Sequence, residues 1–264
     1  MNRPELYAVF GHPIGHSLSP RMHEAAFRSR GWSHRRYIAV DVDRADLTEA
    51  VAAFRRLGGL GVNLTRPLKE EAAASHWLIQ QDAWARAAEA VNTLAPVADG
   101  WAGTNTDAPA LQAALETRGI RPRRALILGS GGAARATWRA LQMHAEVTVS
   151  SRRPAPFVGP ERWIPWDAWP HSSQQFDLIV NCTPLGQDHE PAMAPLPAFR
   201  PGQTAVDWVY VPRATAFLSA ARDEGAETVD GLELLARQAA LSWVTWFGEP
   251  GPWEVMLAAA EDLC

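Results

Sequence analysis

Short apolar runs alternate with segments of helical periodicity along almost the whole chain of 264 residues. The apolar runs are only a few residues long and are bounded by turn residues, so they predict buried β-strands. Alternating strands and helices are typical of an α/β fold. Strands are expected at residues 6–10, 36–40, 61–64, 90–94, 101–105, 125–128, 146–150, 178–181 and 204–207. Helices are expected at residues 21–30, 44–57, 107–118, 132–143, 231–247 and 253–263, whereas residues 151–175 fit neither pattern.

A glycine-rich loop stands between the strand predicted at 125–128 and the helix that follows it. It reads Gly129, Ser130, Gly131, Gly132, Ala133, Ala134 and fits the pattern G-x-G-x-x-G/A. In a βαβ unit such a loop makes a tight turn, lets backbone N–H groups approach a pyrophosphate and allows close helix–strand packing. The helix N-terminus then faces the phosphates. The loop predicts a dinucleotide site, and an ordinary glycine-rich turn is the alternative.

The residues after the next strand bear on the choice of cofactor. An NAD-binding protein usually carries an acidic residue there for the ribose 2′-hydroxyl, whereas this chain has Ser151, Arg152 and Arg153. Two guanidinium groups suit a 2′-phosphate through bidentate, charge-assisted hydrogen bonds. The sequence therefore favours NADP, with a solvated basic loop as the alternative.

Lys69 is the only lysine among 25 cationic side chains, the other 24 being arginines. An ammonium group can be tuned to exchange a proton near neutral pH, whereas arginine stays protonated. Lys69 also follows the strand predicted at 61–64, and ligands of open α/β sheets bind beyond the carboxyl ends of strands. Lys69 is therefore a candidate catalytic residue, although a solvated surface charge is the simpler interpretation of a single lysine.

Three further polar groups are candidates for the same site. Asp107 offers the carboxylate that a catalytic lysine would need, although Thr106 or Asp107 could instead cap the following helix. Ser17 and Ser19 offer hydroxyls to a polyol substrate. Ser19 is also expected to be the N-cap of the first helix, with Pro20 at the first helical position, so its function stays open.

Composition excludes several classes of partner. A net charge of −4 and a pI of about 6.1 argue against nucleic acid or an anionic membrane surface. Apolar runs stay well short of the ~20 residues that span a bilayer. Cys182 and Cys264 are too few for a disulfide framework, so a reducing cytoplasm is expected. His12 and His16 could suggest a metal pair, but no third ligand lies at a recognisable spacing, and no metal is expected.

Taken together, these segments resemble the shikimate dehydrogenase family over nearly the whole chain. Residues 11–20 are similar to that family's G-x-P-x-x-H-S-x-S-P, 63–69 to N-x-T-x-P-x-K, 90–93 to A-V-N-T, 105–107 to N-T-D, 181–186 to N-x-T-x-x-G and 230–239 to D-G-x-x-x-L-x-x-Q-A. Each motif is common alone, whereas the ordered set is specific. The resemblance implies a substrate domain (1–106 plus 231–264, the C-terminal helices packing back) and a Rossmann-type NADP domain (107–230), with the cleft where they meet.

The resemblance also implies roles for individual residues. Lys69 and Asp107 would form the catalytic pair. Substrate contacts would be Ser17, Ser19, Thr65, Lys69, Asn92, Asp107, Tyr210 and Gln238. Cofactor contacts would be Gly129, Ser130, Gly131, Gly132, Ala133, Ser151, Arg152, Arg153, Thr183, Val209 and Gly231, with Val209, Tyr210 and Gly231 along the nicotinamide.

The activity implied is the reversible NADP-dependent reduction of 3-dehydroshikimate to shikimate, on the route to chorismate and the aromatic amino acids. Two alternatives stay open. One is a quinate/shikimate dehydrogenase with relaxed substrate or cofactor choice, and the other is a catalytically silent NADP- or shikimate-binding regulator. The presence of both Lys69 and Asp107 argues against the regulator, because a pure binder needs no proton donor. The expected assembly is a monomer or a homodimer.

Overall fold

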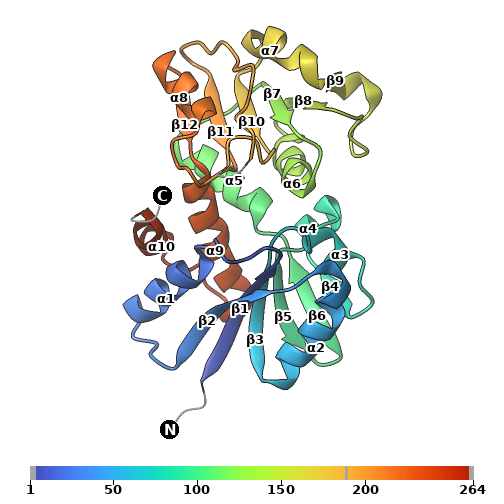
Figure 1. The fold of residues 1–264 in the computed structure, drawn as a ribbon, viewed down its shortest axis with the longest axis vertical. Helices are drawn as coiled ribbons and strands as arrows, with labels where there is room; N and C mark the ends of the chain where they lie inside the picture. Colours follow the sequence, from blue (N-terminus) through green and yellow to red (C-terminus); the bar gives the residue numbers. More distant parts are fainter. Residues whose placement is uncertain (1–3, 188–189, 262–264) are drawn as a thin grey trace. The chain divides into compact units, whose positions relative to one another are not determined.

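The structure is a computed structural model and describes residues 4–187 and 190–261. The chain divides into two compact units. Unit 1 contains the chain up to Thr106 together with the segment from Ala236 onward, and unit 2 contains Asp107–Leu235. Each unit has its own six-stranded sheet with helices around it (Figure 1), which confirms the predicted α/β fold class.

Unit 1 is built on a mixed sheet with the strand order β2-β1-β3-β5-β6-β4. Its strands are β1 (Glu5–Gly11), β2 (Arg35–Asp41), β3 (Gly59–Leu64), β4 (Leu78–Gln81), β5 (Thr93–Val97) and β6 (Gly100–Thr104). β1 runs parallel to β2 and β3, whereas β5 is antiparallel to both β3 and β6. The parallel strands β1 and β3 therefore end at the same edge of the sheet.

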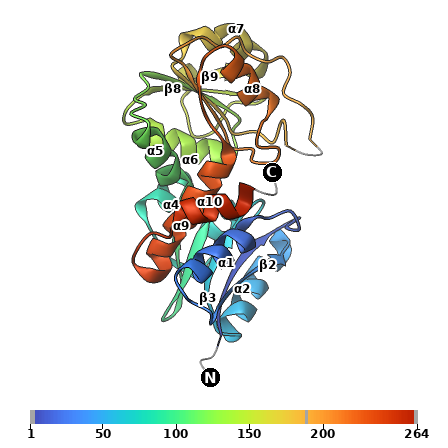
Figure 2. The ribbon, with the colours of Figure 1, turned by 90° about the vertical axis from the view of Figure 1, so that its left-hand side faces the viewer.

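Helices cover both faces of this sheet. They are α1 (Ser19–Ser29), α2 (Leu47–Arg56, preceded by the 3-10 turn Arg44–Asp46), α3 (Lys69–Ala73), α4 (Ala83–Ala88), the C-terminal part of α9 (Gly231–Phe247) and α10 (Trp253–Glu261). On one face Val51 and Phe54 of α2 pack with Phe10 of β1. Tyr7 also belongs to β1, but its side chain lies on the other face of the sheet, where it contacts Phe27 and Phe247. There α10 packs on α1 (Figure 2), as the sequence predicts.

Unit 2 is a doubly wound unit on an all-parallel sheet with the order β12-β11-β10-β7-β8-β9. Its strands are β7 (Arg124–Leu128), β8 (Glu146–Ser151), β9 (Trp163–Pro165), β10 (Leu178–Asn181), β11 (Thr204–Asp207) and β12 (Glu227–Val229). Its helices are α5 (Asp107–Thr117), α6 (Gly132–Leu141), α7 (Trp169–Ser172), α8 (Ala216–Asp223) and the first turn of α9, with 3-10 turns at Pro160–Arg162, Trp166–Ala168 and Ser173–Gln175. The strand order reverses between β7 and β10, which is where such sheets bind ligands.

The structure corrects several local predictions. The strand expected at 90–94 begins only at Thr93, because Glu89 takes a left-handed conformation and ends α4 just before it. The prediction of Ser19 as the N-cap is wrong. Leu18 occupies that position with a helical backbone, and Ser19 is the first residue of α1. The short elements β4, β9, β12, α3, α4 and α7 were not predicted, because their few residues show no clear period. The helix α8 was also missed, although its eight residues are amphipathic and bury Phe217, Leu218 and Ala221.

Candidate active site

The loops that follow β1 and β3 are hydrogen-bonded to each other at the carboxyl edge of the sheet in unit 1. The Thr65 N–H donates to the Phe10 carbonyl at 2.9 Å, and the His12 N–H donates to the Arg66 carbonyl at 3.2 Å. The first loop carries Ser17, and the second leads to Lys69. The geometry of parallel strands thus places two of the predicted motifs side by side.

Lys69 is half-buried and is the first residue of the short helix α3. Its carbonyl accepts a hydrogen bond from the Val91 N–H at 2.9 Å, while the Leu64 N–H donates to the Asn92 carbonyl at 2.9 Å. These backbone bonds tie the segment before β5 to the loop after β3. The predicted contacts Thr65, Lys69 and Asn92 therefore belong to one region of unit 1.

The Asn92 side chain is buried and held by defined partners. Its Oδ1 accepts from the Thr106 N–H at 2.9 Å, and its Nδ2 donates to the Thr106 hydroxyl at 2.9 Å. The Thr106 hydroxyl lies 3.2 Å from Asn92 Oδ1 and 3.4 Å from Gln238 Oε1, and its one hydrogen can be donated to either oxygen. Asn92 and Gln238, both predicted substrate contacts, thus both lie within hydrogen-bonding distance of Thr106. The Thr106 hydroxyl therefore has partners besides any helix cap it could form.

Ser17 and Ser19 differ in their surroundings. Ser19 is buried and is the first residue of α1, with Leu18 at the N-cap position, so Ser19 is not the N-cap of this helix. The Ser17 hydroxyl is half-buried and accepts from the Ser19 N–H at 3.3 Å. Ser17, rather than Ser19, therefore supports the start of the helix.

His12 lies on the surface and pairs with a carboxylate. Its Nδ1 is 2.6 Å from Asp41 Oδ1, and this hydrogen bond raises the pKa of His12 above its usual value while lowering the pKa of Asp41. In the part of the chain that the structure describes, no group of three or more His, Cys, Asp or Glu residues could hold a metal ion. Among the same residues, no helix is long and apolar enough to cross a membrane.

The glycine loop of unit 2 lies between β7 and α6, as its sequence pattern predicts. Gly129 has φ of +110°, a conformation that favours glycine, and a side chain there would meet the Cys182 carbonyl. A Cβ on Gly131 would meet nothing within 4 Å, so the backbone is open to a ligand at this point. Ala134 is fully buried, which allows α6 to pack closely on the sheet. The loop fits a bound pyrophosphate.

The loops after β10 and β11 are joined by a buried pair, Asn181 and Asp207. Asn181 Oδ1 accepts from the Thr183 N–H at 3.0 Å and from its hydroxyl at 2.7 Å, and Asn181 Nδ2 donates to Asp207 Oδ1 at 2.8 Å. The Val209 N–H donates to the same carboxylate at 3.0 Å. Burial raises the pKa of Asp207 to about 6, against the opposing effect of these hydrogen bonds. The pair thus positions the predicted cofactor contacts Thr183 and Val209.

Gly231 is the first residue of α9 and lies against the segment after β11. A Cβ there would come within 2.3 Å of the Val209 carbonyl oxygen, so only glycine fits without a shift of the backbone. Tyr210 is half-buried and follows Val209 directly. The structure thus brings Val209 and Gly231 together, and their contact with a nicotinamide stays a prediction.

Ser151, at the end of β8, is buried, whereas Arg152 and Arg153 are exposed. The Ser151 hydroxyl donates to the Arg153 carbonyl at 2.5 Å and accepts from Trp163 Nε1 at 3.0 Å. Ser151 therefore shapes the loop that carries the two arginines. Exposed guanidinium groups directly after β8 suit a phosphate that arrives from solvent.

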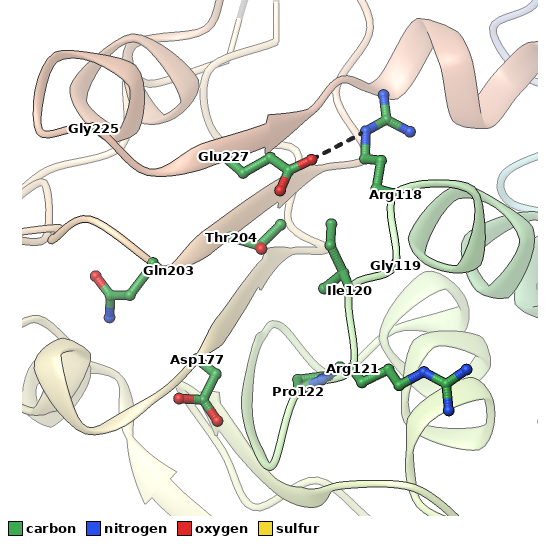
Figure 3. A pocket seen from close by; sticks show the side chains of 11 residues that line it. Arg118, Gly119, Ile120, Arg121, Pro122, Asp177, Gln203, Thr204, Gly225 and Glu227 are labelled. Carbon is green, nitrogen blue, oxygen red and sulfur yellow. Dashed lines mark ion pairs between the residues drawn. The ribbon is translucent and has the colours of Figure 1, made fainter.

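A pocket of about 420 Å³ also opens in unit 2, at the opposite edge of its sheet. Figure 3 shows Arg118, Asp177, Thr204 and Glu227 around it, with an ion pair of 3.7 Å between Arg118 Nε and Glu227 Oε1. These residues lie at or near the amino ends of β10, β11 and β12, or in the loop before β7. The predicted cofactor contacts follow the carboxyl ends, so this pocket is separate from the glycine loop.

Sequence reasoning assigned no role to three buried polar residues near the predicted contacts. They are Asn63 and Asn181, which begin two of the quoted motifs, and Asp207. Each is at most 5% exposed and lies in the last residues of a strand. A single polar residue within an otherwise apolar run was the available signal, because a buried polar group needs a hydrogen-bond partner.

Comparisons with known proteins agree with this geometry. Residues 9–94 match the family model of the shikimate dehydrogenase substrate binding domain. The chain is 39% identical to a shikimate dehydrogenase (NADP(+)) of Symbiobacterium thermophilum, over 97% of this chain and 93% of that protein. It is 38% identical to the shikimate 5-dehydrogenase of Thermus thermophilus in complex with NADP(H) and shikimate, with a TM-score of 0.88 over 98% of this chain and 99% of that one. The 5-ketofructose reductase of Gluconobacter is also similar, at 26% identity and a TM-score of 0.82, with 100% of both chains covered.

Proposed function

Because the chain belongs to the shikimate dehydrogenase family, we propose that Lys69 and Asp107 are the acid–base pair of its reaction. The reaction is the reversible NADP-dependent reduction of 3-dehydroshikimate to shikimate, on the route to chorismate and the aromatic amino acids. The position of Lys69 in the structure is the main support for assigning it this catalytic role. The only lysine of the chain stands at the start of α3, beyond the carboxyl end of β3, and backbone hydrogen bonds tie this segment to Asn92.

The proposed chemistry follows from the charge that develops during reduction. NADPH, when bound, supplies the hydride. Negative charge then grows on the former ketone oxygen, and the Lys69 ammonium holds this oxygen and passes a proton to it, which is general acid catalysis. Asp107 orients the ammonium and a substrate hydroxyl. The remaining proposed substrate contacts, which position the ring, are Ser17, Ser19, Thr65, Asn92, Tyr210 and Gln238.

The cofactor site proposed in unit 2 fits a dinucleotide. Gly131 leaves room for the pyrophosphate, and the N-terminus of α6 points its N–H groups toward it. Ser130, Gly132 and Ala133 complete this loop. Arg152 and Arg153 would hold the 2′-phosphate, while Thr183, Val209 and Gly231 would lie near the nicotinamide.

The test of the proposed function is a steady-state assay with shikimate and quinate, each against NADP and NAD. Turnover is expected to be fastest with shikimate and NADP. Comparable rates with quinate or NAD would instead support the relaxed dehydrogenase. Binding of NADP and shikimate without turnover would identify a silent regulator and would contradict the assignment of Lys69 and Asp107.

Removing the two exposed arginines is expected to change the cofactor preference. In an Arg152→Ala/Arg153→Ala double variant, the KM for NADP should rise by roughly 10–100-fold, because charge-assisted hydrogen bonds to a phosphate are lost. The KM for NAD should change much less, since NAD lacks the 2′-phosphate. Equal changes for both cofactors would show that these arginines do not bind the 2′-phosphate.

Gly131→Ala is expected to weaken NADP binding and leave the fold intact. The backbone at Gly131 (φ −84°, ψ −168°) is accessible to alanine, and the added Cβ meets no protein atom within 4 Å. The methyl group would occupy the space into which a pyrophosphate must come. The melting temperature of the variant without cofactor should match the wild type, while the dissociation constant for NADP rises by about tenfold or more. Unchanged NADP affinity would place the pyrophosphate elsewhere.

We further propose that the enzyme works in the cytoplasm as a monomer or homodimer, without a nucleic-acid or membrane partner. The net charge of −4 and the small number of cysteines support this. Sedimentation of the purified chain over a range of concentrations would measure its assembly, and a larger oligomer would contradict the proposal.

A further inference from the structure

Two segments leave neighbouring strands of unit 2 at the same edge of the sheet. β11 and β12 are parallel and pair only as far as Val206 and Val229, so the residues that follow are not held by this ladder. Val209 follows β11 and Gly231 follows β12, and a Cβ on Gly231 would clash with the Val209 carbonyl. The spacing of these two proposed nicotinamide contacts therefore depends on bonds formed beyond the ladder.

Asp230, directly before α9, forms one such bond with each oxygen of its carboxylate. Its Oδ1 accepts a hydrogen bond from the Glu233 N–H at 2.9 Å, which is the N-cap interaction of α9. Its Oδ2 accepts from Arg213 Nε at 2.9 Å, and Arg213 lies in the loop between β11 and α8. One carboxylate therefore stabilises the start of the helix and binds the loop that contains Val209.

The first turn of α9 is held in place by a second ion pair. The Glu233 side chain is buried, and its two carboxylate oxygens accept from Arg118 Nη1 and Nη2 at 2.9 and 2.6 Å. A bidentate pair of this kind restricts the orientation of both side chains. Arg118 and residues 230–235 all belong to unit 2, so Asp230 is attached to a fixed part of that unit.

The loop between β11 and α8 is closed at its ends by Asp207. The two carboxylate oxygens of Asp207 accept from the Val209 N–H at 3.0 Å and from the Thr215 hydroxyl at 2.7 Å. Arg213 lies between these two bonds, and its ion pair with Asp230 connects the loop to the start of α9. Asp207 thus fixes the ends of the loop, whereas Asp230 fixes its distance from α9.

We propose that Asp230 is a positioning residue for the nicotinamide half of the cofactor. Its carboxylate holds the start of α9 at a fixed distance from the loop after β11, so that Val209 and Gly231 form a site of constant width for the nicotinamide ring. The rate of hydride transfer depends steeply on the position of this ring relative to the ketone carbon. The inference rests on the proposed function, because it takes Val209 and Gly231 to contact the nicotinamide.

Two substitutions of Asp230 separate the ion pair from the helix cap. Asp230→Asn keeps a good N-cap but presents an uncharged NH₂ group to Arg213, whereas Asp230→Ala loses both bonds. Arg213→Met removes the same ion pair from the other side and keeps much of the side-chain length. Arg200→Gln is the control, because the exposed Arg200 pairs with Asp177 at 3.8 Å at the opposite edge of the same sheet.

Four measurements on the wild type and each variant distinguish the possible roles. Steady-state kinetics give kcat and the KM for NADPH, and single-turnover experiments give the rate of hydride transfer. Inhibition by 2′,5′-ADP reports on the adenosine half of the cofactor site alone, because this molecule has no nicotinamide. Thermal unfolding gives the melting temperature.

Asp230→Asn and Arg213→Met are expected to slow hydride transfer by about tenfold, while the inhibition constant of 2′,5′-ADP stays within about twofold of the wild type. The double variant should be no slower than either single variant, because all three lose the same ion pair. Arg200→Gln should transfer hydride at the wild-type rate.

Several results would overturn the inference. A loss confined to Asp230→Ala would leave Asp230 as a helix cap only, and a lower melting temperature with an unchanged hydride-transfer rate would show a purely structural role. Equal losses for 2′,5′-ADP and for hydride transfer, or an equally slow Arg200→Gln, would show an effect that is not specific to the nicotinamide. A wild type that does not turn over shikimate with NADP would overturn the proposed function and this inference together, whereas wild-type turnover with unaltered variants would overturn only the inference.

Discussion

Replacing Lys69 by arginine is expected to lower kcat by about 10²–10⁴-fold, the usual contribution of acid–base catalysis. The substitution keeps the positive charge and much of the side-chain volume, and arginine still offers hydrogen bonds to the substrate oxygen. It cannot release a proton near neutral pH, because its pKa is too high. The KM for shikimate should change much less, since the other proposed contacts still hold the ring. Steady-state kinetics with shikimate and NADP measure both constants.

The single lysine also permits a chemical test. An amine-selective reagent can modify only Lys69 and the amino terminus of this chain. Modification should inactivate the wild type, and bound shikimate should protect it. The Lys69→Arg variant is the matched control, because modification of its amino terminus alone should leave the residual activity as it was. A Lys69→Arg variant with near-normal kcat would reduce Lys69 to an electrostatic anchor and contradict the proposed mechanism.

The sequence alone predicts the parts of the fold whose apolar period is complete. β7 and β10 are continuous buried runs, as expected for parallel strands covered on both faces, and both were predicted within one residue. The four residues of β4 include two glutamines and show no such run, so the strand was missed. The predicted N-cap position at Ser19 was wrong for a different reason. Leu18 already has helical backbone angles, so α1 begins at Ser19 and Leu18 is the N-cap residue.

Local motifs were also sufficient for the glycine loop, because the turn, the helix start and the ligand-facing backbone all lie within six residues of sequence. The supporting network could not be predicted in this way. Asn63 and Ser242 are 179 positions apart in the chain, and only the packing of α9 on the sheet brings them together. The same holds for Gly231, which needs to be glycine because of the Val209 carbonyl, a contact that no local pattern reveals.

Acidification is expected to destabilise the protein through one buried histidine. His23 is fully buried, and its Nδ1 accepts from Trp243 Nε1 at 3.0 Å, so the ring is neutral with its hydrogen on Nε2. Within the described part of the chain, Nε2 has no hydrogen-bond partner that could stabilise a charge. Burial lowers the pKa of His23 from 6.5 to about 3. The unfolded chain therefore binds one proton more than the folded chain between these values, and this residue's contribution to stability is lost as the pH falls below 6.5.

The size of the effect follows from the difference in pKa. The difference between the His23 pKa of 6.5 in the unfolded chain and about 3 in the folded chain corresponds to about 5 kcal/mol of unfolding free energy. Of this free energy, about 2 kcal/mol is lost when the pH falls from 7.5 to 5. Asp207 acts in the opposite sense, because its raised pKa lets the folded state bind more protons than the unfolded state between pH 3.8 and about 6. The pH dependence of the wild type is thus a sum of opposing contributions, and the effect of His23 appears in the difference between wild type and variant.

His23→Gln isolates this contribution, because glutamine does not titrate and its oxygen can still accept from Trp243. The free energy of unfolding, measured by urea titration at pH 7.5 and pH 5, should fall by about 2 kcal/mol less in the variant than in the wild type. The variant should also be less stable than the wild type at pH 7.5, where the stacking of His23 on Tyr37 at 4.1 Å is lost. His76→Gln, at an exposed histidine of the same unit, is the control and should keep the wild-type pH dependence. Equal losses of stability on acidification in His23→Gln and the wild type would contradict this prediction. They would mean that His23 is protonated in the folded protein at pH 5 and that its surroundings tolerate the charge.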